Sequence, residues 1–288
     1  MKKDIRYLHT KKQRHEPITV LTCYDYPTAC LQEKAGIDII FVGDSVGTNI
    51  LGYQSETEVT MADMLHHLKA VRRGVTDAYL LVDLPFAADR KPAQAVTNAN
   101  LFVSHGADGV KLEGGIEKVP IIAALTEAGI ETCAHIGHNP QIHGTKAATH
   151  GKTVAKAKQL IKAAGALTEA GAKLIVLEKI TEEVSQLITE SVSIPTIGIG
   201  AGRFCDGQVL VINDILGIGP AFKHAKRYQE YGSLTFEAIC RYKEEVEGGD
   251  FPIDANVAHI APDKLARVRK WLQLPESSVS NQRHPARQ

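Results

Sequence analysis

Ionisable side chains close five consecutive apolar segments of this chain. In sequence order these side chains, with one adjacent serine, are Asp44 with Ser45, Asp83, Lys111 with Glu113, His135 and Glu178. A single junction of this kind is explained by turn formation, because Asp caps backbone amides and Gly tolerates a positive φ. Turn formation places polar residues in the loops, however, whereas here they end the apolar segments themselves. The repetition therefore predicts that these side chains share one site.

The three acids of this set, Asp44, Asp83 and Glu113, are hard oxygen donors. Carboxylates that lie together raise each other's pKa, and a divalent cation such as Mg2+ removes that repulsion. Lys111 and Glu113 are two residues apart, so in a strand they point to the same face. We therefore expect a magnesium site beside a lysine. The alternative is a structural ion pair between lysine and aspartate, since ion-pair networks also gather charges.

The histidines provide a second possible set of metal ligands. His135 and His138 could form a transition-metal pair, but the first strand carries no His-x-His and cysteine ligands are absent. The carboxylates therefore favour a cation with oxygen ligands over Zn2+. We expect His135 to donate a hydrogen bond to the substrate and His138 to be solvated. His66 and His67 are predicted to lie on the surface of a helix, because neither belongs to its apolar stripe.

The elements that must position these residues include eight short apolar segments. The segments are continuous rather than alternating, as in strands buried on both faces of a parallel sheet. Helical patterns separate most of them, and one pattern, residues 60–74, begins with Thr60 as an expected N-cap. Gly36, Gly129 and Gly171 each follow Ala at a predicted helix end, where glycine adopts a left-handed conformation. The eight segments are residues 18–25, 37–44, 78–85, 109–115, 131–137, 172–178, 194–202 and 208–217.

Eight strands alternating with helices over about 250 residues predict a (β/α)8 TIM barrel of the α/β class. A doubly wound open sheet is the alternative, but residues 198–203, GIGAGR, do not match GxGxxG and come late in the chain. In a barrel these glycines either contribute to a phosphate site or permit a tight turn. We expect residues 1–252 to form a single barrel domain. Because the C-terminal strand ends of a barrel build its active site, the charged strand ends would meet at one mouth.

The overall composition excludes several classes of partner. Lys plus Arg equals Asp plus Glu at 33 each, so no net charge attracts nucleic acid or an anionic membrane. The first 16 residues are basic but lack the apolar stretch of a signal peptide, and no apolar run approaches a bilayer span. The five cysteines are scattered without a CxxC pair, which is typical of reduced thiols. We expect a cytoplasmic protein with neither a nucleic-acid nor a membrane partner.

Several motifs are specific when taken together in this order: TCYDYPTA, VGDSVGTNILGY, DLPF, VKLEGG, AHIGHNPQ and IVLE. From about residue 15 to residue 252 the chain resembles the ketopantoate hydroxymethyltransferase family, also called 3-methyl-2-oxobutanoate hydroxymethyltransferases. The resemblance implies a barrel of the phosphoenolpyruvate mutase and isocitrate lyase type. It also implies transfer of a hydroxymethyl group from 5,10-methylenetetrahydrofolate to 3-methyl-2-oxobutanoate through a Mg2+-stabilised enolate. The product would be 2-dehydropantoate, on the route to pantothenate and coenzyme A.

The resemblance assigns a role to each strand-end residue. It implies one Mg2+ per subunit, held by Asp44, Asp83 and Glu113, and a small-molecule 2-oxo acid with 5,10-methylenetetrahydrofolate as co-substrate. The family's general base falls on Glu178. We also expect the protein to form a homo-oligomer. The family's contacts to the keto acid fall on Asp44, Ser45, Asp83, Lys111 and His135.

The loops that cover the site depart from the family pattern. Residues 138–141, HNPQ, stand where the family usually has an apolar residue followed by Thr-Pro-Gln. Residues 142–153 replace a glycine-rich loop, and residues 55–58, SETE, stand where Thr-Leu-Pro is common. These changes bear on the choice of keto acid or folate and leave the metal and enolate chemistry intact. Residues 253–288 lie beyond the match; the pattern predicts a short amphipathic helix over 261–274, followed by a disordered end.

Two other functions remain open from the residues alone. The first is a related metal-enolate enzyme, a C–C lyase, mutase or aldol-type enzyme, acting on a different 2-oxo acid. Lyases of this superfamily usually carry a reactive Cys in the loop near the fifth strand, whereas Cys133 lies inside the strand segment itself. The second is a non-enzymatic binding protein that kept the pocket. The intact acids at positions 44, 83, 113 and 178 argue against it.

Overall fold

The computed structural model of the protein describes residues 2–143 and 148–273. The chain forms two compact units, of which the first covers Met1–Tyr228 and the second begins at Gln229. The first unit contains all the strands of the sheet and every strand-end residue discussed above. It is therefore the unit that positions the predicted site.

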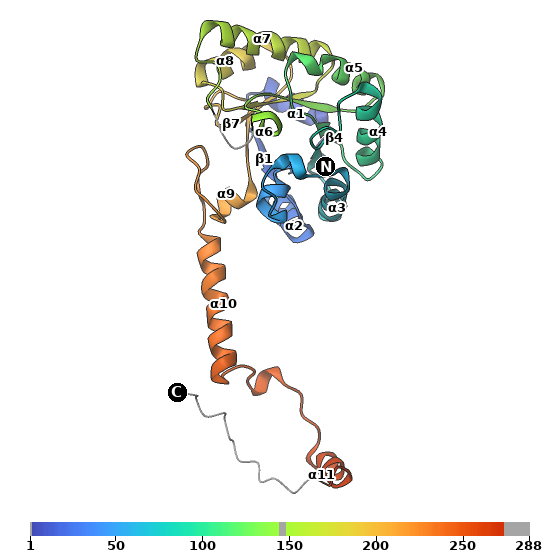
Figure 1. Ribbon diagram of the computed structural model, residues 1–288, viewed down its shortest axis with the longest axis vertical. Coiled ribbons are helices and arrows are strands. Elements are labelled where there is room, and N and C mark those ends of the chain that lie inside the picture. Colours follow the sequence, from blue (N-terminus) through green and yellow to red (C-terminus); the bar gives the residue numbers. More distant parts are fainter. Residues whose placement is uncertain (1, 144–147, 274–288) are drawn as a thin grey trace. The chain divides into compact units, whose positions relative to one another are not determined.

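A closed barrel of parallel strands forms the centre of this first unit (Figure 1). Each strand pairs with the next in the sequence, and β8 pairs with β1 to complete the circle, with Val20 opposite Val209. This confirms the predicted (β/α)8 barrel. The strands are β1 Ile18–Thr22, β2 Ile39–Val42, β3 Tyr79–Asp83, β4 Gly109–Lys111, β5 Thr132–Gly137, β6 Leu174–Glu178, β7 Thr196–Ile199 and β8 Gly207–Leu210.

Alternate strand residues fill two separate apolar cores. In β2, Ile39 and Phe41 belong to the cluster inside the barrel, while Ile40 and Val42 pack in the cluster that includes the helices. Side chains alternate between the two faces of a strand, so burial on both faces requires the continuous apolar segments seen in the sequence. The same alternation directs every second residue at a strand end toward the mouth of the barrel.

Helices surround the strands of the first unit (Figure 1). Helix α3 begins as predicted, because the Thr60 hydroxyl accepts a hydrogen bond from the Asp63 amide. Gly36, Gly129 and Gly171 adopt left-handed φ values of 80°, 74° and 107°, which confirms the predicted helix ends. The helices are α1 Ile5–Gln13, α2 Tyr26–Ala35, α3 Met61–Arg72, α4 Pro92–Val103, α5 Val119–Glu127, α6 Pro140–His143, α7 Val154–Glu169, α8 Glu182–Ser191 and α9 Ile212–Leu216. Short helical turns lie at Gly47–Leu51, Glu56–Glu58 and Ile116–Lys118.

Two local predictions are wrong. The segment 208–217 is not one strand, because β8 ends at Leu210 and α9 begins at Ile212, whose amide donates to the Thr22 hydroxyl. His67 is buried rather than on the surface, and its Nδ1 lies 2.6 Å from the Tyr24 carbonyl oxygen. Its spacing from Met64 places it on the buried stripe of α3, where a backbone carbonyl satisfies the ring.

The second unit contains helix α10 Tyr231–Gly248, a short turn at Asp254–Asn256 and helix α11 Pro262–Trp271. Helix α11 lies where the sequence pattern predicts a short helix. The predicted domain division at residue 252 stays a prediction, and the predicted disorder of the last residues, 274–288, lies outside the described residues. None of the described helices is both long and apolar enough to cross a membrane.

Candidate active site

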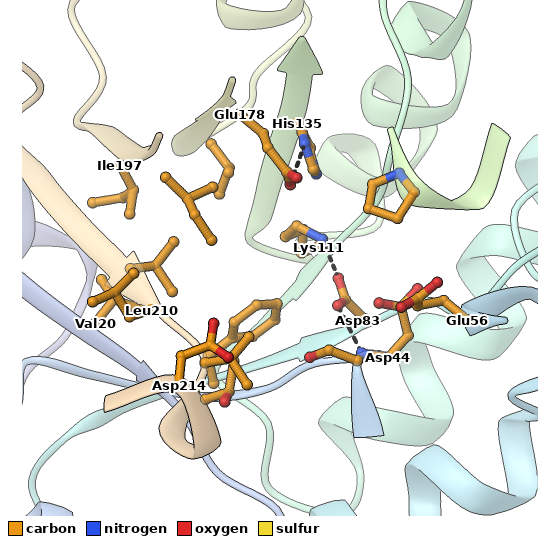
Figure 2. A pocket seen from close by; sticks show the side chains of 18 of the residues that line it. Val20, Asp44, Glu56, Asp83, Lys111, His135, Glu178, Ile197, Leu210 and Asp214 are labelled. Atoms are coloured by element: carbon orange, nitrogen blue, oxygen red, sulfur yellow. Dashed lines mark hydrogen bonds and ion pairs between the residues drawn. The ribbon is translucent and has the colours of Figure 1, made fainter. Parts of the chain in front are cut away.

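The predicted site residues line one cavity of about 350 Å³ at the C-terminal ends of the strands (Figure 2). Asp44 and Ser45 follow β2, Asp83 ends β3, and Glu178 ends β6. The histidine comes from β5, between these acids in the sequence. The structure thus brings together all seven residues that the sequence placed at one mouth. The acidic and basic residues that line the cavity, histidines apart, are Asp44, Glu56, Asp83, Lys111, Glu113, Glu178, Lys179 and Asp214.

The turn after β2 fixes its two site residues through neighbouring strand ends. The Asp44 amide donates to Asp83 Oδ2 at 3.0 Å, which links the ends of β2 and β3. The Ser45 hydroxyl lies 2.8 Å from the hydroxyl of Tyr24, which is itself buried after β1. The Asp44 carboxylate and the Ser45 hydroxyl are therefore held at the cavity wall without a flexible loop.

Lys111 occupies the middle of the acidic group. Its Nζ lies 2.6 Å from Asp83 Oδ1 and 3.5 Å from Glu113 Oε1, and 5.3 Å from the centre of the Phe41 ring. Burial alone would lower the pKa of this lysine, but the carboxylates of Asp83, Glu113 and Asp44 raise it above its ordinary value. Lys111 is therefore a fixed ammonium ion at the mouth of the barrel.

The acids around Lys111 differ in how well their charge is balanced. Burial raises the pKa of Asp44 well above its ordinary value, and the neighbouring charges of Asp83 and Glu113 raise it further. Glu113 is also buried, yet Lys111 and His135 lower its pKa to about 2. Burial also raises the pKa of Asp83, and the charge of Lys111 opposes that rise. The group thus contains more carboxylates than the lysine alone can balance.

His135 lies between two glutamates. Its Nδ1 is 3.5 Å from Glu113 Oε1 and its Nε2 is 3.5 Å from Glu178 Oε2. Neither ring nitrogen makes a hydrogen bond within the described part of the chain, although the ring is buried. A buried imidazole of this kind has hydrogen-bonding capacity left for a ligand in the cavity.

Glu178 lies apart from the acids around Lys111. Its nearest charged partners are His135 at 3.5 Å and Lys179 Nζ at 3.8 Å. Lys179 adopts a left-handed φ of 48°, a strained conformation that turns the chain sharply directly after this glutamate. Burial raises the pKa of Glu178, and His135 opposes that rise. The cavity thus holds a carboxyl group with raised pKa, separate from the three-acid group.

Two polar residues of the site were missed in the sequence. The side-chain Nε2 of Gln141 donates to Asp44 Oδ2 at 2.7 Å, and the backbone N–H of Gln141 donates to Glu113 Oε2 at 3.3 Å. Tyr24 positions Ser45, as described above. The retained Pro-Gln pair at 140–141, within an otherwise changed loop, was the available signal for the first of these.

His138 is buried, so the expectation that it is solvated is wrong. Its amide donates to the Glu178 carbonyl oxygen at 2.8 Å, and its side chain lines the cavity. The β5–β6 pairing therefore continues one residue past Gly137, and the His138 ring joins the cavity lining. The adjacent loop residues 144–147, which belong to the changed loop of the sequence analysis, lie outside the described residues.

The donor set fits a magnesium ion that is shared with a substrate. In residues 2–143 and 148–273, no three His, Cys, Asp or Glu side chains converge closely enough to enclose a metal by themselves. Mg2+ usually binds through one or two carboxylates, with water and substrate oxygens completing its octahedron. Three buried carboxylates with one ammonium ion, a formal charge of −3 + 1 = −2, also match a divalent cation.

The chain is similar in sequence to known proteins over most of its length. The sequence profile of the ketopantoate hydroxymethyltransferase family matches residues 2–254. A 3-methyl-2-oxobutanoate hydroxymethyltransferase of Dehalococcoides mccartyi is 47% identical over 260 residues, covering 88% of this chain and 92% of that protein. The enzyme of the same name from Thermosipho africanus is 45% identical over 254 residues, covering 86% and 95%.

Solved structures share the fold. A phosphonopyruvate hydrolase, solved as a complex with oxalate and Mg2+, has a TM-score of 0.59 at 14% identity, covering 95% of this chain and 97% of that one. A 2,3-dimethylmalate lyase, a member of the phosphoenolpyruvate mutase and isocitrate lyase superfamily, has a TM-score of 0.54 at 14% identity, covering 95% and 96%. The barrel thus has the fold that the family resemblance implied.

Proposed function

The chain belongs to the ketopantoate hydroxymethyltransferase family, and we propose that it transfers a hydroxymethyl group from 5,10-methylenetetrahydrofolate to 3-methyl-2-oxobutanoate through an enolate. The product is 2-dehydropantoate, and the reaction depends on Mg2+. One observation carries the proposal: a buried carboxyl group, Glu178, shares a cavity with an acidic group and a fixed lysine but does not contact them. Enolate formation needs this separation, because the base and the groups that stabilise the enolate act on different atoms.

Asp44 and Asp83, supported by Glu113, would hold the metal ion. When bound, Mg2+ supplies positive charge that polarises the keto group and favours loss of a proton from the neighbouring carbon. Gln141 donates to Asp44 and to Glu113, so it restrains both carboxylates in the absence of substrate. The metal preference itself follows from the carboxylate oxygens. Cys133 and three histidines also line the cavity, but in the described residues they form no three-ligand cluster that would favour a softer metal.

Ser45, Lys111 and His135 would bind the oxygen atoms of the keto acid. The Ser45 hydroxyl is held by Tyr24, and the Lys111 ammonium group is held by Asp83 at 2.6 Å. Preorganised donors of this kind stabilise negative charge as it develops, because they need no reorganisation during the reaction. His135 has free ring nitrogens within hydrogen-bonding reach of the same space, so it can donate to the developing enolate oxygen.

Glu178 would remove the proton from C3 of the keto acid. A general base is most effective when its pKa lies near the working pH, and burial raises the pKa of this glutamate toward that range. His135, 3.5 Å away, links Glu178 to the enolate-stabilising side of the site. The enolate carbon then forms a C–C bond to the one-carbon unit of the folate, and water supplies the hydroxyl oxygen of the product. Both C–N bonds of the methylene bridge break, and tetrahydrofolate leaves with one proton from water and the one taken from C3.

The barrel interior favours a branched apolar keto acid over a dicarboxylate. The cavity floor is apolar and includes Phe41, Leu81 and Val209. Among the described lining residues, Lys111 and Lys179 are the only lysine or arginine side chains, and both already face carboxylates. A second substrate carboxylate would find no free cation there. This distinguishes the proposal from a related enzyme acting on an acidic 2-oxo acid.

A panel of 2-oxo acids tests the proposal directly. The protein is incubated with Mg2+, 5,10-methylenetetrahydrofolate and either 3-methyl-2-oxobutanoate, a linear 2-oxo acid or a dicarboxylic 2-oxo acid, and the hydroxymethylated product is followed by mass spectrometry. We expect turnover with the branched acid and loss of turnover with a chelator. Preference for the dicarboxylic acid, or cleavage of it without folate, would instead identify a lyase.

A further inference from the structure

Asp214 is a buried acid of the cavity that the chemistry described above does not use. It lies in α9, only 7% of its surface is exposed, and it lines the cavity (Figure 2). Within the described residues, no hydrogen bond or ion pair to its carboxylate occurs at contact distance. A buried carboxylate is costly unless it gains a partner, so an acid in this position indicates a ligand with hydrogen-bond donors.

The short helix that carries Asp214 is fixed on three sides. The Ile212 amide donates to the Thr22 hydroxyl at 2.9 Å, at the end of β1. Asn213 Nδ2 donates to the Asn49 carbonyl oxygen at 3.2 Å, in the turn after β2. The Tyr228 amide donates to the Ile215 carbonyl oxygen at 2.8 Å. The position of Asp214 is therefore set by its neighbours in α9, and its own carboxylate is not needed to hold the helix.

The residues that follow Asp214 in the chain and line the cavity are mainly apolar. They include Ile218, Pro220 and Phe222 from the segment after α9, which form a wall of the cavity together with Ile199 at the end of β7. This wall combines apolar side chains with the Asp214 carboxylate, and His224 adds one imidazole from the same segment. The wall suits a planar ring that has apolar faces and adjacent N–H groups on one edge, because the faces can pack while the edge donates.

The keto acid is not such a ligand, since it is an anion without hydrogen-bond donors and the Asp214 carboxylate repels it. The folate that donates the one-carbon unit has both the planar ring and the N–H donors. Its reduced pterin ring carries a 2-amino group beside N3–H, and these two parallel donors match the two oxygens of one carboxylate. Building on the proposed function, we propose that Asp214 binds the 2-amino-4-oxo-pyrimidine edge of the tetrahydrofolate and selects this co-substrate. The site is then divided into a metal and keto-acid side and a pterin side.

The alternative is that Asp214 is a structural acid, stabilised by the positive charge of Arg227. Burial raises the pKa of Asp214, and the charge of Arg227 opposes that rise. Arg227 Nη2 donates to the Gly219 carbonyl oxygen at 2.6 Å, so this guanidinium group has a backbone partner. A structural acid would affect stability and both substrates together, whereas a pterin contact would affect the folate alone.

The test combines Asp214→Asn with a change in the ligand. Binding of tetrahydrofolate and of its 2-desamino analogue is measured by calorimetry for the wild type and the variant, with Glu131→Gln as the matched control. Glu131 is a partly buried acid that is not among the residues lining the cavity, and its Oε2 accepts a hydrogen bond from the Tyr79 hydroxyl at 2.9 Å. Turnover with both substrates and folate-independent exchange of the C3 proton of 3-methyl-2-oxobutanoate in D2O are measured alongside.

We expect Asp214→Asn to weaken tetrahydrofolate binding by about 10- to 100-fold, the range for hydrogen bonds to a charged group, and to leave C3 exchange unchanged. The wild type should bind the 2-desamino analogue more weakly than tetrahydrofolate, and the variant should bind the two alike. Glu131→Gln should bind both folates as the wild type does. Equal losses for both ligands, or a parallel loss of C3 exchange, would overturn the assignment. Absence of wild-type turnover with folate, despite C3 exchange, would refute the proposed function and this inference with it.

Discussion

Replacement of Glu178 by glutamine separates proton abstraction from metal binding. Glutamine keeps the size of the side chain and removes the basic oxygen. The contacts of Lys111, Asp83 and Asp44 do not involve Glu178, so metal and keto-acid binding should survive. Removal of a general base slows proton transfer by about 10²- to 10⁴-fold, and a factor of 10² corresponds to about 2.7 kcal/mol of activation free energy.

The structure provides a matched control for this variant. Glu113 and Glu178 lie at the same 3.5 Å from the two nitrogens of His135, but only Glu113 also contacts Lys111. Exchange of the C3 proton of 3-methyl-2-oxobutanoate in D2O is measured by NMR, and Mn2+ affinity by electron paramagnetic resonance. We expect Glu178→Gln to lose exchange and keep Mn2+ affinity, whereas Glu113→Gln should weaken Mn2+ binding.

The pH dependence gives a second readout of the same variant. The base must be ionised to accept a proton, and burial raises the pKa of Glu178. Wild-type exchange should therefore fall as the pH is lowered through that raised pKa, and Glu178→Gln should lose this dependence together with its rate. Exchange at the wild-type rate in Glu178→Gln, with the pH profile unchanged, would show that another group is the base.

Three further variants test the rest of the site and the fold. Asp44→Ala should abolish turnover and weaken Mn2+ binding in electron paramagnetic resonance. The variant should stay folded by circular dichroism, because one of several like charges is removed. Unchanged Mn2+ affinity would contradict the metal assignment. His67→Leu should lower the free energy of unfolding in urea by about 1–3 kcal/mol, because a buried carbonyl loses its partner, whereas the exposed His66→Leu should be nearly neutral. Burial would raise the pKa of Asp38, but its hydrogen bonds and Lys11 lower it to about 2. Asp38→Asn should therefore lower thermal stability at pH 7, with a loss that shrinks as the pH falls below about 4; a loss independent of pH would refute this.

The strand-end residues could be predicted because they depend on local patterns. A continuous apolar segment that ends in Asp83 or Glu178 specifies both the strand and the end at which its acid lies, and the barrel rule brings such ends together. Their roles in catalysis, by contrast, rest on the family resemblance and on the experiments above.

The other site features depend on contacts that the sequence does not show. Gln141 is uncharged and reaches Asp44 across 97 positions, so no local pattern marks it. Asp214 was hidden because residues 208–217 have the composition of a strand, and the helix begins only where Thr22 accepts the Ile212 amide hydrogen. His67 was misplaced because histidine was treated as polar, although its spacing on α3 matched the buried stripe.

The charges around Lys111 favour the proposed metal site over a structural network of ion pairs. A structural ion pair is complete with Lys111 and Asp83, which lie 2.6 Å apart. Asp44 and Glu113 add two more carboxylates to the same buried space, and stability gains nothing from them, since each ionised group is costly to remove from water. A formal charge of −2 at the mouth of a barrel is instead suited to binding a divalent cation together with an anionic substrate. A divalent cation offsets it, and the single negative charge of a 2-oxo acid then finds the Lys111 ammonium group and the Ser45 hydroxyl already positioned.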